Sequence, residues 1–375
     1  MQFHLRGSDR GAMKQVPETW LAAALSGDAS PDLREFPPAE VWRAAEEHDV
    51  LPLLDWHLQK CPAWIGFPES FRSALKRHAR AEAAQGLFRL HELRRVSARL
   101  EREGIRALLL KGTALGQWLY PQPYLRVSGD IDLLFADRGE ADRAAGALSS
   151  LGYALQFSPA STNYEMTSCL VVDGASRSEL DLHCRLLNAA AYAETFSFEE
   201  LWKFSQPLPN LGIGLRGLSL LHALAHACLN RGLDMQLGVP DRLKLLYDIH
   251  LMVRRMDAAA WDDFLEIATD KGICGPCLRS IQDAASRLGS SVPDGSLVAL
   301  RHHAEREAVD WRRLHDWRYM QRHNLRSLPT WQARVSWVWD RVFPTTSHLR
   351  ELYGNGSWAG LMRTRILRAV GRLRR

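Results

Sequence analysis

Apolar residues recur at every third or fourth position over roughly the first hundred residues, and again from about residue 198 onward. This spacing places the apolar side chains on one face of a helix. Prolines separate three predicted N-terminal helical segments, TWLAAALSG, PAEVWRAAEEHDVLPLLDWHLQK and a long stretch from Pro68 to Gly104. The pattern therefore indicates helical regions on both sides of a middle part with a different character.

The middle part, from about residue 105 to 190, consists of short apolar runs. IRALLLKG and DIDLLF predict buried strands, with a short helix in TALGQWLY between them and an amphipathic helix in RGEADRAAGALSSLGY after them. ALQFS, NYEMTSCLVVD and SELDLHCRLL, separated by turns that contain Gly and Ser, predict antiparallel strands. This order indicates an α+β fold in which a small sheet carries helices on one face.

Length and composition are those of an ordinary soluble protein. The 375 residues allow two or three domains, and the contents of 46% hydrophobic and 24% charged residues are typical of globular chains. No apolar run reaches the roughly 18 residues of a transmembrane helix. The first residues, MQFHLRGSDRGAMKQ, lack the apolar core of a secretory signal. We therefore expect a cytoplasmic protein.

Positive charge is concentrated at the C-terminal end. Residues 301–375 contain sixteen arginines, no lysine and six acidic residues, a net charge of +10 in a chain of net charge +5. Six tryptophans lie in the same region: Trp311, Trp317, Trp331, Trp337, Trp339 and Trp358. Such a region could bind nucleic acid through phosphate contacts and stacking, and less readily an anionic membrane surface. The favoured interpretation is a helical cap with tryptophan on its core face and arginine outside.

Two other motifs receive structural interpretations. Cys274 and Cys277 have the spacing of a redox motif, but the surrounding pattern is helical rather than βαβ. A helix N-terminus with Pro276 in its first turn fits better. His222 and His226 share a helix face and could bind a metal, but their apolar surroundings favour a packed helix.

Candidate chemistry begins with Asp130 and Asp132. Residues two apart on a strand point to the same face, and the neighbouring side chains Ile131, Leu133, Leu134 and Phe135 are apolar. Unpaired carboxylates are costly in such surroundings. One or two Mg²⁺ ions, or Mn²⁺, would stabilise them, since these cations prefer carboxylates together with substrate phosphates. Solvated charges at an exposed strand end are the alternative.

Gly112 and Thr113 lie between a predicted strand and helix. A small residue lets the backbone approach a phosphate, and a helix N-terminus offers N–H groups to it. Thr113 could cap the helix or bind a phosphate oxygen; an ordinary strand-to-helix turn is the alternative. Lys111 and Arg126 are the nearest residues in sequence that could neutralise phosphate charge.

A third carboxylate comes from SELDLHCRLL. Alternation places Glu179, Asp181 and His183 on one face of this strand. Asp181 could complete a two-metal site or accept the proton of an attacking hydroxyl, although pairing with an arginine is also open. His183 could orient Asp181 or touch substrate, and a structural histidine is the alternative.

The order of these motifs resembles the uncharacterised nucleotidyltransferase family of the DNA polymerase β-like superfamily. The resemblance rests on Lys111-Gly112-Thr113, then Arg126 with the run from Gly129 to Leu134, then Asp181-Leu182-His183. It covers residues 100–190 well and extends loosely to LLHALAHACLN and RLKLLYDIHLMV. It differs from the usual superfamily pattern in the sixteen residues between Thr113 and Asp130.

The resemblance implies a polymerase-β-type palm, a small mixed sheet with helices, flanked by N- and C-terminal helical regions. Asp130, Asp132 and Asp181 would be catalytic and would bind metal. Lys111, Gly112, Thr113, Arg126 and Gly129 would bind the nucleoside triphosphate. The expected regions are a helical one over 1–100, the nucleotidyltransferase domain over 101–205, a helical domain over 206–300 and the basic region over 301–375.

The expected reaction transfers a nucleoside monophosphate from a nucleoside triphosphate to a hydroxyl or phosphate of an acceptor. A small-molecule or peptide acceptor is favoured, and RNA or a protein hydroxyl is the first alternative. The second alternative is a non-catalytic module that binds nucleotide as a sensor. The three aspartates favour the catalytic interpretation.

Overall fold

A computed structural model of the chain describes residues 18–26, 36–157, 165–172, 176–208, 211–212, 214–344 and 346–373. The N-terminal segment in which no signal was recognised lies outside the described residues. The first helices are α1 (Glu18–Ser26), α2 (Pro38–Glu47), α3 (Leu51–Leu58), the 3₁₀ turn η1 (Pro62–Gly66) and α4 (Glu69–Arg102). Asp49, with a φ of 55°, separates α2 from α3, and α4 ends just before Gly104, as predicted.

A mixed seven-stranded sheet follows, in the order β3-β4-β5-β2-β1-β7-β6. The part of the chain that forms the sheet begins with β1 (Ala107–Leu109), α5 (Lys111–Trp118), η2 (Pro123–Leu125), β2 (Ile131–Leu134) and α6 (Arg138–Ser149). Then come β3 (Ala154–Phe157), β4 (Glu165–Val172) and β5 (Ser176–His183), which pair antiparallel to one another as predicted. The α+β class and the palm-like mixed sheet are confirmed.

Two strands that the sequence pattern did not predict complete the sheet. They are β6 (Gln206–Pro207) and β7 (Leu215–Gly217), and β7 pairs parallel to β1. Strands of two and three residues are too short to show an alternation of apolar and polar side chains. β7 is placed by its pairing with β1, about a hundred residues earlier in the chain, and β6 is placed by its pairing with β7.

Helices cover both faces of the sheet, so the expectation of helices on one face is wrong. Leu109 and Leu133 join a core with α4 and α6. Leu108 and Leu134, which point to the opposite face by alternation, join a larger core with α8 and α9. Each face of the central strands is apolar enough to bury a helical layer, and the strand pattern alone does not say how many layers form.

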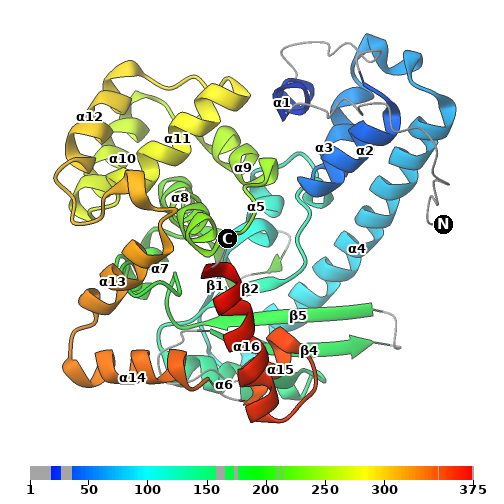
Figure 1. Cartoon of the computed structure of the whole chain (residues 1–375). Helices are drawn as coiled ribbons and strands as arrows, with labels where there is room; N and C mark the ends of the chain where they lie inside the picture. The colour runs from blue at the N-terminus through cyan, green and yellow to red at the C-terminus, as the bar shows by residue number, and fades with distance from the viewer. Residues whose placement is uncertain are drawn as a thin grey trace.

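Of the remaining helices, α8 to α12 are grouped at one end of the molecule (Figure 1). Their bounds are α7 (Phe198–Phe204), α8 (Leu220–Leu237), α9 (Leu243–Val253), α10 (Ala258–Asp270), α11 (Cys274–Leu288) and α12 (Asp294–Ala304). Helix α11 begins at Cys274 with Pro276 in its first turn, which confirms the structural interpretation of that motif.

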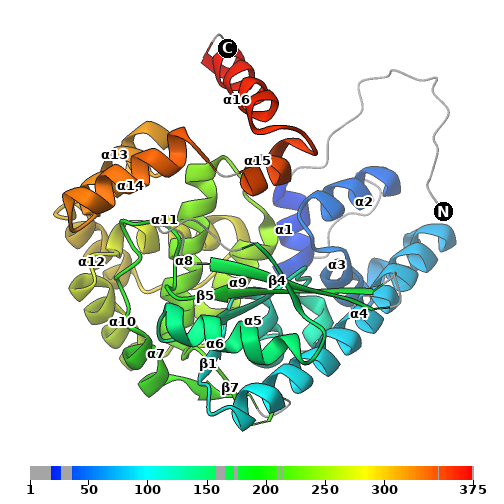
Figure 2. The ribbon, with the colours of Figure 1, turned by 90° about the horizontal axis from the view of Figure 1, so that it is seen from below.

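The basic region forms η4 (Trp311–Arg313), α13 (Trp317–Ser327), α14 (Trp331–Val342), α15 (Thr346–Tyr353) and α16 (Trp358–Leu373). Helix α16 projects from the rest of the chain (Figure 2). The expectation of tryptophans on a core face is wrong for four of the six: Trp317, Trp331, Trp339 and Trp358 are exposed. In the described part of the chain, no helix combines the length and apolar character needed to cross a bilayer.

Candidate active site

Three aspartates meet on the face of the sheet that α8 covers. Asp130 lies just before β2, Asp132 lies within it, and Asp181 lies on the neighbouring parallel strand β5. Asp132 and Asp181 are direct register partners, and one carboxylate oxygen from each of the three aspartates lies within 4.8 Å of the others. The i and i+2 spacing therefore places two carboxylates together, and strand pairing adds the third.

Burial differs among the three. Asp132 is completely buried, Asp181 is buried at 8% exposure, and Asp130 is partly open to solvent. A ligand that approaches the cluster would therefore meet Asp130 first. The two inner carboxylates need compensating charge or hydrogen bonds, because an ionised carboxylate in an apolar core is strongly disfavoured.

Asp132 receives that compensation from two cationic or polar groups. The Lys111 ammonium forms an ion pair with Oδ1 of Asp132, and Nε2 of His183 lies 2.9 Å from the same oxygen. Burial alone would raise the pKa of Asp132, but Lys111 and His183 outweigh it and hold the pKa well below its usual range. Asp132 is therefore an anion throughout the physiological pH range.

Asp130 is fixed mainly through its backbone. Thr113 donates from Oγ1 to the carbonyl oxygen of Asp130 at 2.8 Å, and Ser128 lies within 3.4 Å of the Asp130 carboxylate. Arg89 of α4 donates to the Ser128 carbonyl and lies close enough for its charge to interact with Asp130. The loop before β2 is thus held from both sides, which leaves the Asp130 carboxylate facing the open part of the site.

The turn into α5 begins earlier than predicted, because Lys111 and Gly112 already belong to the helix. Leu110 is the N-cap residue and no side chain caps the helix, so the capping interpretation of Thr113 is wrong; Thr113 bonds to Asp130 instead. The first N–H groups of a helix have no helical partner, and here they belong to the turn of Gly112 and Thr113. That turn lies next to the aspartates, since the N–H of Leu110 donates to the carbonyl oxygen of Asp132 at 2.9 Å.

Arg126 packs against Gly112, lines the same side of the site as Lys111, and is paired with a carboxylate of the protein itself. Its guanidinium bonds to both carboxylate oxygens of Asp248 on α9, at 2.7 to 2.9 Å, and both side chains are buried. Tyr120 donates to the same carboxylate at 2.7 Å. Burial would lower the pKa of Arg126, but Asp248 outweighs it and raises the pKa above its usual value. The charge of Arg126 is therefore largely neutralised within the protein.

Gly112 packs directly on this buried pair. A Cβ atom at this position would lie 2.6 Å from Nη1 and 2.8 Å from Cζ of Arg126. The contact with Arg126 therefore requires glycine at this position, whether or not a ligand also binds at the turn. Gly129, by contrast, is exposed, and a Cβ atom there would meet no atom within 4 Å.

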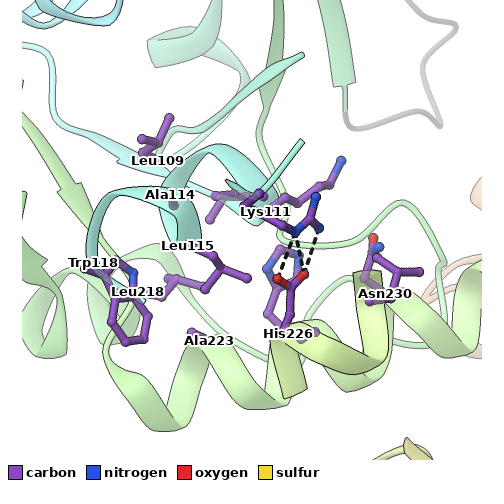
Figure 3. A pocket seen from close by; sticks show the side chains of 15 residues that line it. Leu109, Lys111, Ala114, Leu115, Trp118, Leu218, Ala223, His226 and Asn230 are labelled. Carbon is purple, nitrogen blue, oxygen red and sulfur yellow. Dashed lines mark hydrogen bonds and ion pairs between the residues drawn. The ribbon is translucent and has the colours of Figure 1, made fainter. Parts of the chain in front are cut away.

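A small pocket, with a cavity volume of about 40 Å³, opens between the α5 turn and α8. Trp118, Leu115 and Leu218 form part of its apolar wall, while Lys111, His226 and Asn230 supply polar groups (Figure 3). His226 is buried, and its Nε2 has no hydrogen-bond partner in the described part of the chain. Burial, together with the nearby Lys111 charge, lowers the pKa of His226 to about 3. His226 therefore presents a neutral ring to the pocket.

The structure brings Lys111, Gly112, Thr113 and His183 next to the aspartates, and His183 contacts Asp132. The sequence analysis missed Asp248 and Arg89. His226 was considered only together with His222, which bonds to Ser219 and packs against phenylalanine rings instead. The periodicity of α8 already contained a signal, because a histidine on an apolar helix face must meet a polar partner or a ligand.

Comparison with known protein families agrees with this geometry. A family model described as an uncharacterised nucleotidyltransferase matches residues 34–289, more than half of the 375 residues. The chain belongs to the uncharacterised nucleotidyltransferase family. The matched part contains the sheet, the three aspartates and the helices from α2 to α11. The basic region lies outside it, and no curated protein matches the chain.

The site of this family member suits a hard divalent cation. All three clustered donors are carboxylates, which is the ligand type that Mg²⁺ and Mn²⁺ prefer. Oδ2 of Asp132 is buried and has no hydrogen-bond partner among the described residues. A buried oxygen without a partner is rare in proteins, and a cation bound by the cluster would satisfy it.

Proposed function

We propose that the chain transfers a nucleoside monophosphate from a nucleoside triphosphate to a hydroxyl or phosphate of a small-molecule or peptide acceptor. The observation that carries the proposal is the convergence of Asp130, Asp132 and Asp181 beside the first turn of α5, within a nucleotidyltransferase family match. Carboxylates on adjoining strands next to free helical N–H groups can hold a metal and a phosphate side by side.

In this proposal Asp130, Asp132 and Asp181 hold Mg²⁺ or Mn²⁺. The ion, when bound, would neutralise phosphate charge and activate the attacking oxygen. The N–H groups of Gly112 and Thr113 bind phosphate oxygens, and Lys111 adds a positive charge. Arg126 packs against Gly112, and the exposed Gly129 leaves room beside Asp130.

The reaction that these residues would carry is an in-line displacement at phosphorus. The acceptor oxygen forms a bond to the α-phosphorus, and the bond between the α-phosphorus and the bridging oxygen breaks, which releases pyrophosphate. Asp181 accepts the acceptor's proton. His183 positions Asp132 through the hydrogen bond at 2.9 Å.

The test uses the whole chain with α-labelled nucleoside triphosphates, Mg²⁺ and fractionated small molecules or peptides from cell extract. We expect labelled acceptor and equimolar pyrophosphate, both lost in Asp130→Asn and in Asp132→Asn. Asp257→Asn is the matched control, since this aspartate caps α10 and lies outside the site. Magnesium-dependent nucleotide binding without pyrophosphate from any acceptor would instead support the sensor alternative, and no nucleotide binding at all would reject both.

The basic region supplies a specific observation that favours RNA as a second acceptor. Residues 301–375 have a net charge of +10, and Trp331 and Trp339 are 69% and 61% exposed on α14. Exposed aromatic rings and arginines together bind single-stranded nucleic acid by stacking and phosphate contacts. A parallel reaction with RNA would label the RNA, and the double variant Trp331→Ala/Trp339→Ala would reduce that labelling while labelling of a small molecule persists.

A further inference from the structure

Lys111 occupies an unusual place for a residue expected to bind phosphate. Its ammonium points to the metal cluster and pairs with Oδ1 of Asp132. The Asp132 side chain is 0% exposed and the Lys111 side chain 29% exposed. The lysine thus reaches from the solvent-accessible turn into the buried part of the site, and it contributes positive charge where a divalent cation would otherwise be required.

An ammonium and a divalent cation on one carboxylate oppose each other. Like charges a few ångströms apart repel each other in a partly buried site, and a divalent ion doubles the repulsion that a single charge would exert. The other two carboxylates lie within 4.8 Å, so a metal bound by all three would be close to the ammonium. Metal binding and the Lys111 contact with Asp132 are therefore in competition.

A second position for the Lys111 ammonium lies at the pocket. It is the first residue of α5 and adopts a φ of 49°, a conformation that residues other than glycine rarely take. The same residue lines the pocket next to Gly112, where helical N–H groups favour a phosphate. His226, which also lines the pocket (Figure 3), is buried, and its Nε2 has no hydrogen-bond partner among the described residues. The ammonium can therefore leave Asp132 for a phosphate bound at this turn.

We propose that Lys111 acts as a built-in counter-ion, which neutralises Asp132 while the site is free of nucleotide and moves to the triphosphate when the metal–nucleotide complex binds. The site then binds a free divalent cation weakly and binds the cation together with nucleotide strongly. This inference rests on the proposed function, because it assumes that the aspartates bind metal and that the α5 turn binds phosphate.

The test measures Mn²⁺ binding by electron paramagnetic resonance, with and without a non-hydrolysable nucleoside triphosphate. Lys111→Met removes the charge at similar size, Lys111→Arg keeps the charge, and Asp132→Asn removes the ligand. Lys271→Met is the matched control, since Lys271 pairs with Glu200 at 2.7 Å and is 27% exposed. Thermal unfolding of each variant, with and without Mn²⁺, reports whether it is folded.

We expect Lys111→Met to bind Mn²⁺ about ten-fold more tightly than the unaltered chain when nucleotide is absent, an effect typical of coupled sites. Nucleotide should strengthen Mn²⁺ binding in the unaltered chain and in Lys111→Arg, but much less in Lys111→Met. Equal or weaker Mn²⁺ binding by a folded Lys111→Met would overturn the counter-ion role and leave the proposed function standing. Absence of Mn²⁺ binding in every protein, with or without nucleotide, would overturn both.

Discussion

Arg126 and Asp248 form a buried ion pair, with three nitrogen–oxygen contacts of 2.7 to 2.9 Å between residues 122 positions apart. The pair joins the loop before β2 to helix α9, and Gly112 rests against it. It therefore connects the phosphate-binding turn of the proposed site to the helical part of the molecule. An arginine that the motif order assigned to nucleotide binding thus has a structural partner that its sequence neighbours do not reveal.

Breaking this pair should strongly destabilise the fold. Asp248→Asn leaves the buried guanidinium without a counter-charge, and removing one partner of a buried ion pair costs about 3–5 kcal/mol. Denaturant unfolding measures the loss. Arg106→Gln is the control, because Arg106 and Glu199 form an exposed pair, and exposed ion pairs contribute little to stability. Equal stabilities of the two variants would contradict the importance of the buried pair.

Gly112→Ala should lower stability and nucleotide affinity together. The added Cβ would lie 2.6 Å from Nη1 of Arg126, whose guanidinium is fixed by Asp248, and such overpacking costs about 1–3 kcal/mol. Gly129→Ala, in open space, should change stability by less than about 0.5 kcal/mol, as surface substitutions usually do. Calorimetric unfolding and nucleotide titration compare the two variants. A Gly112→Ala chain as stable as Gly129→Ala would show that the turn can shift away from Arg126.

His183→Ala should weaken Mn²⁺ binding by roughly ten- to a hundred-fold, the range seen when residues that orient metal ligands are removed. The reason is the loss of the hydrogen bond to Oδ1 of Asp132. His183→Gln, whose amide nitrogen can reach a similar position, should recover part of the affinity. The measurement is the Mn²⁺ titration used above. If neither variant alters the titration, His183 has a packing role only.

Stability should fall as pH drops from neutrality toward 4, partly through His57. Burial lowers the pKa of His57 to about 4, and Lys60 and His250 add to this; its Nε2 lies 2.9 Å from the hydroxyl of Tyr247. As the pH falls, His57 therefore takes up its proton in the unfolded chain before it does so in the folded chain. The free energy of unfolding then rises with pH by up to about 1.4 kcal/mol per pH unit between the pKa of His57 in the folded chain and the ordinary histidine pKa of the unfolded chain.

His57→Gln keeps a polar group at this position but removes its titration. Denaturant unfolding of both proteins between pH 4 and 7 should show a shallower dependence on pH in the variant. The difference between the two curves isolates His57 from the other buried histidines. Parallel curves would show that His57 is protonated equally in the folded and unfolded chains.

Cys274 and Cys277 should resist alkylation in the folded protein. Both are completely buried, and burial raises the pKa of the Cys274 thiol to about 12, so little reactive thiolate forms at neutral pH. Mass spectrometry after brief iodoacetamide treatment measures the modification. Cys61, which is partly exposed, serves as the reactive control. Fast alkylation of Cys274 would contradict this expectation and support the redox interpretation of the motif.

The sequence by itself determined the local parts of the site. Alternation along a strand places Asp130 and Asp132 on one side, and the order of apolar runs sets the α+β class. The order of the motifs indicated the family, and the match over residues 34–289 confirms it. These features depend on residues close together in the chain, so the pattern of apolar and polar positions contains them.

Only the tertiary structure decided which distant groups meet. The parallel pairing of β2 with β5 sets Asp181 opposite Asp132, and α9 supplies the carboxylate that takes up Arg126. The second helical layer, which brings His226 of α8 to the pocket, follows from the packing of two apolar faces. Register and layer packing are fixed by the summed burial of many side chains, and no short stretch of sequence contains that sum.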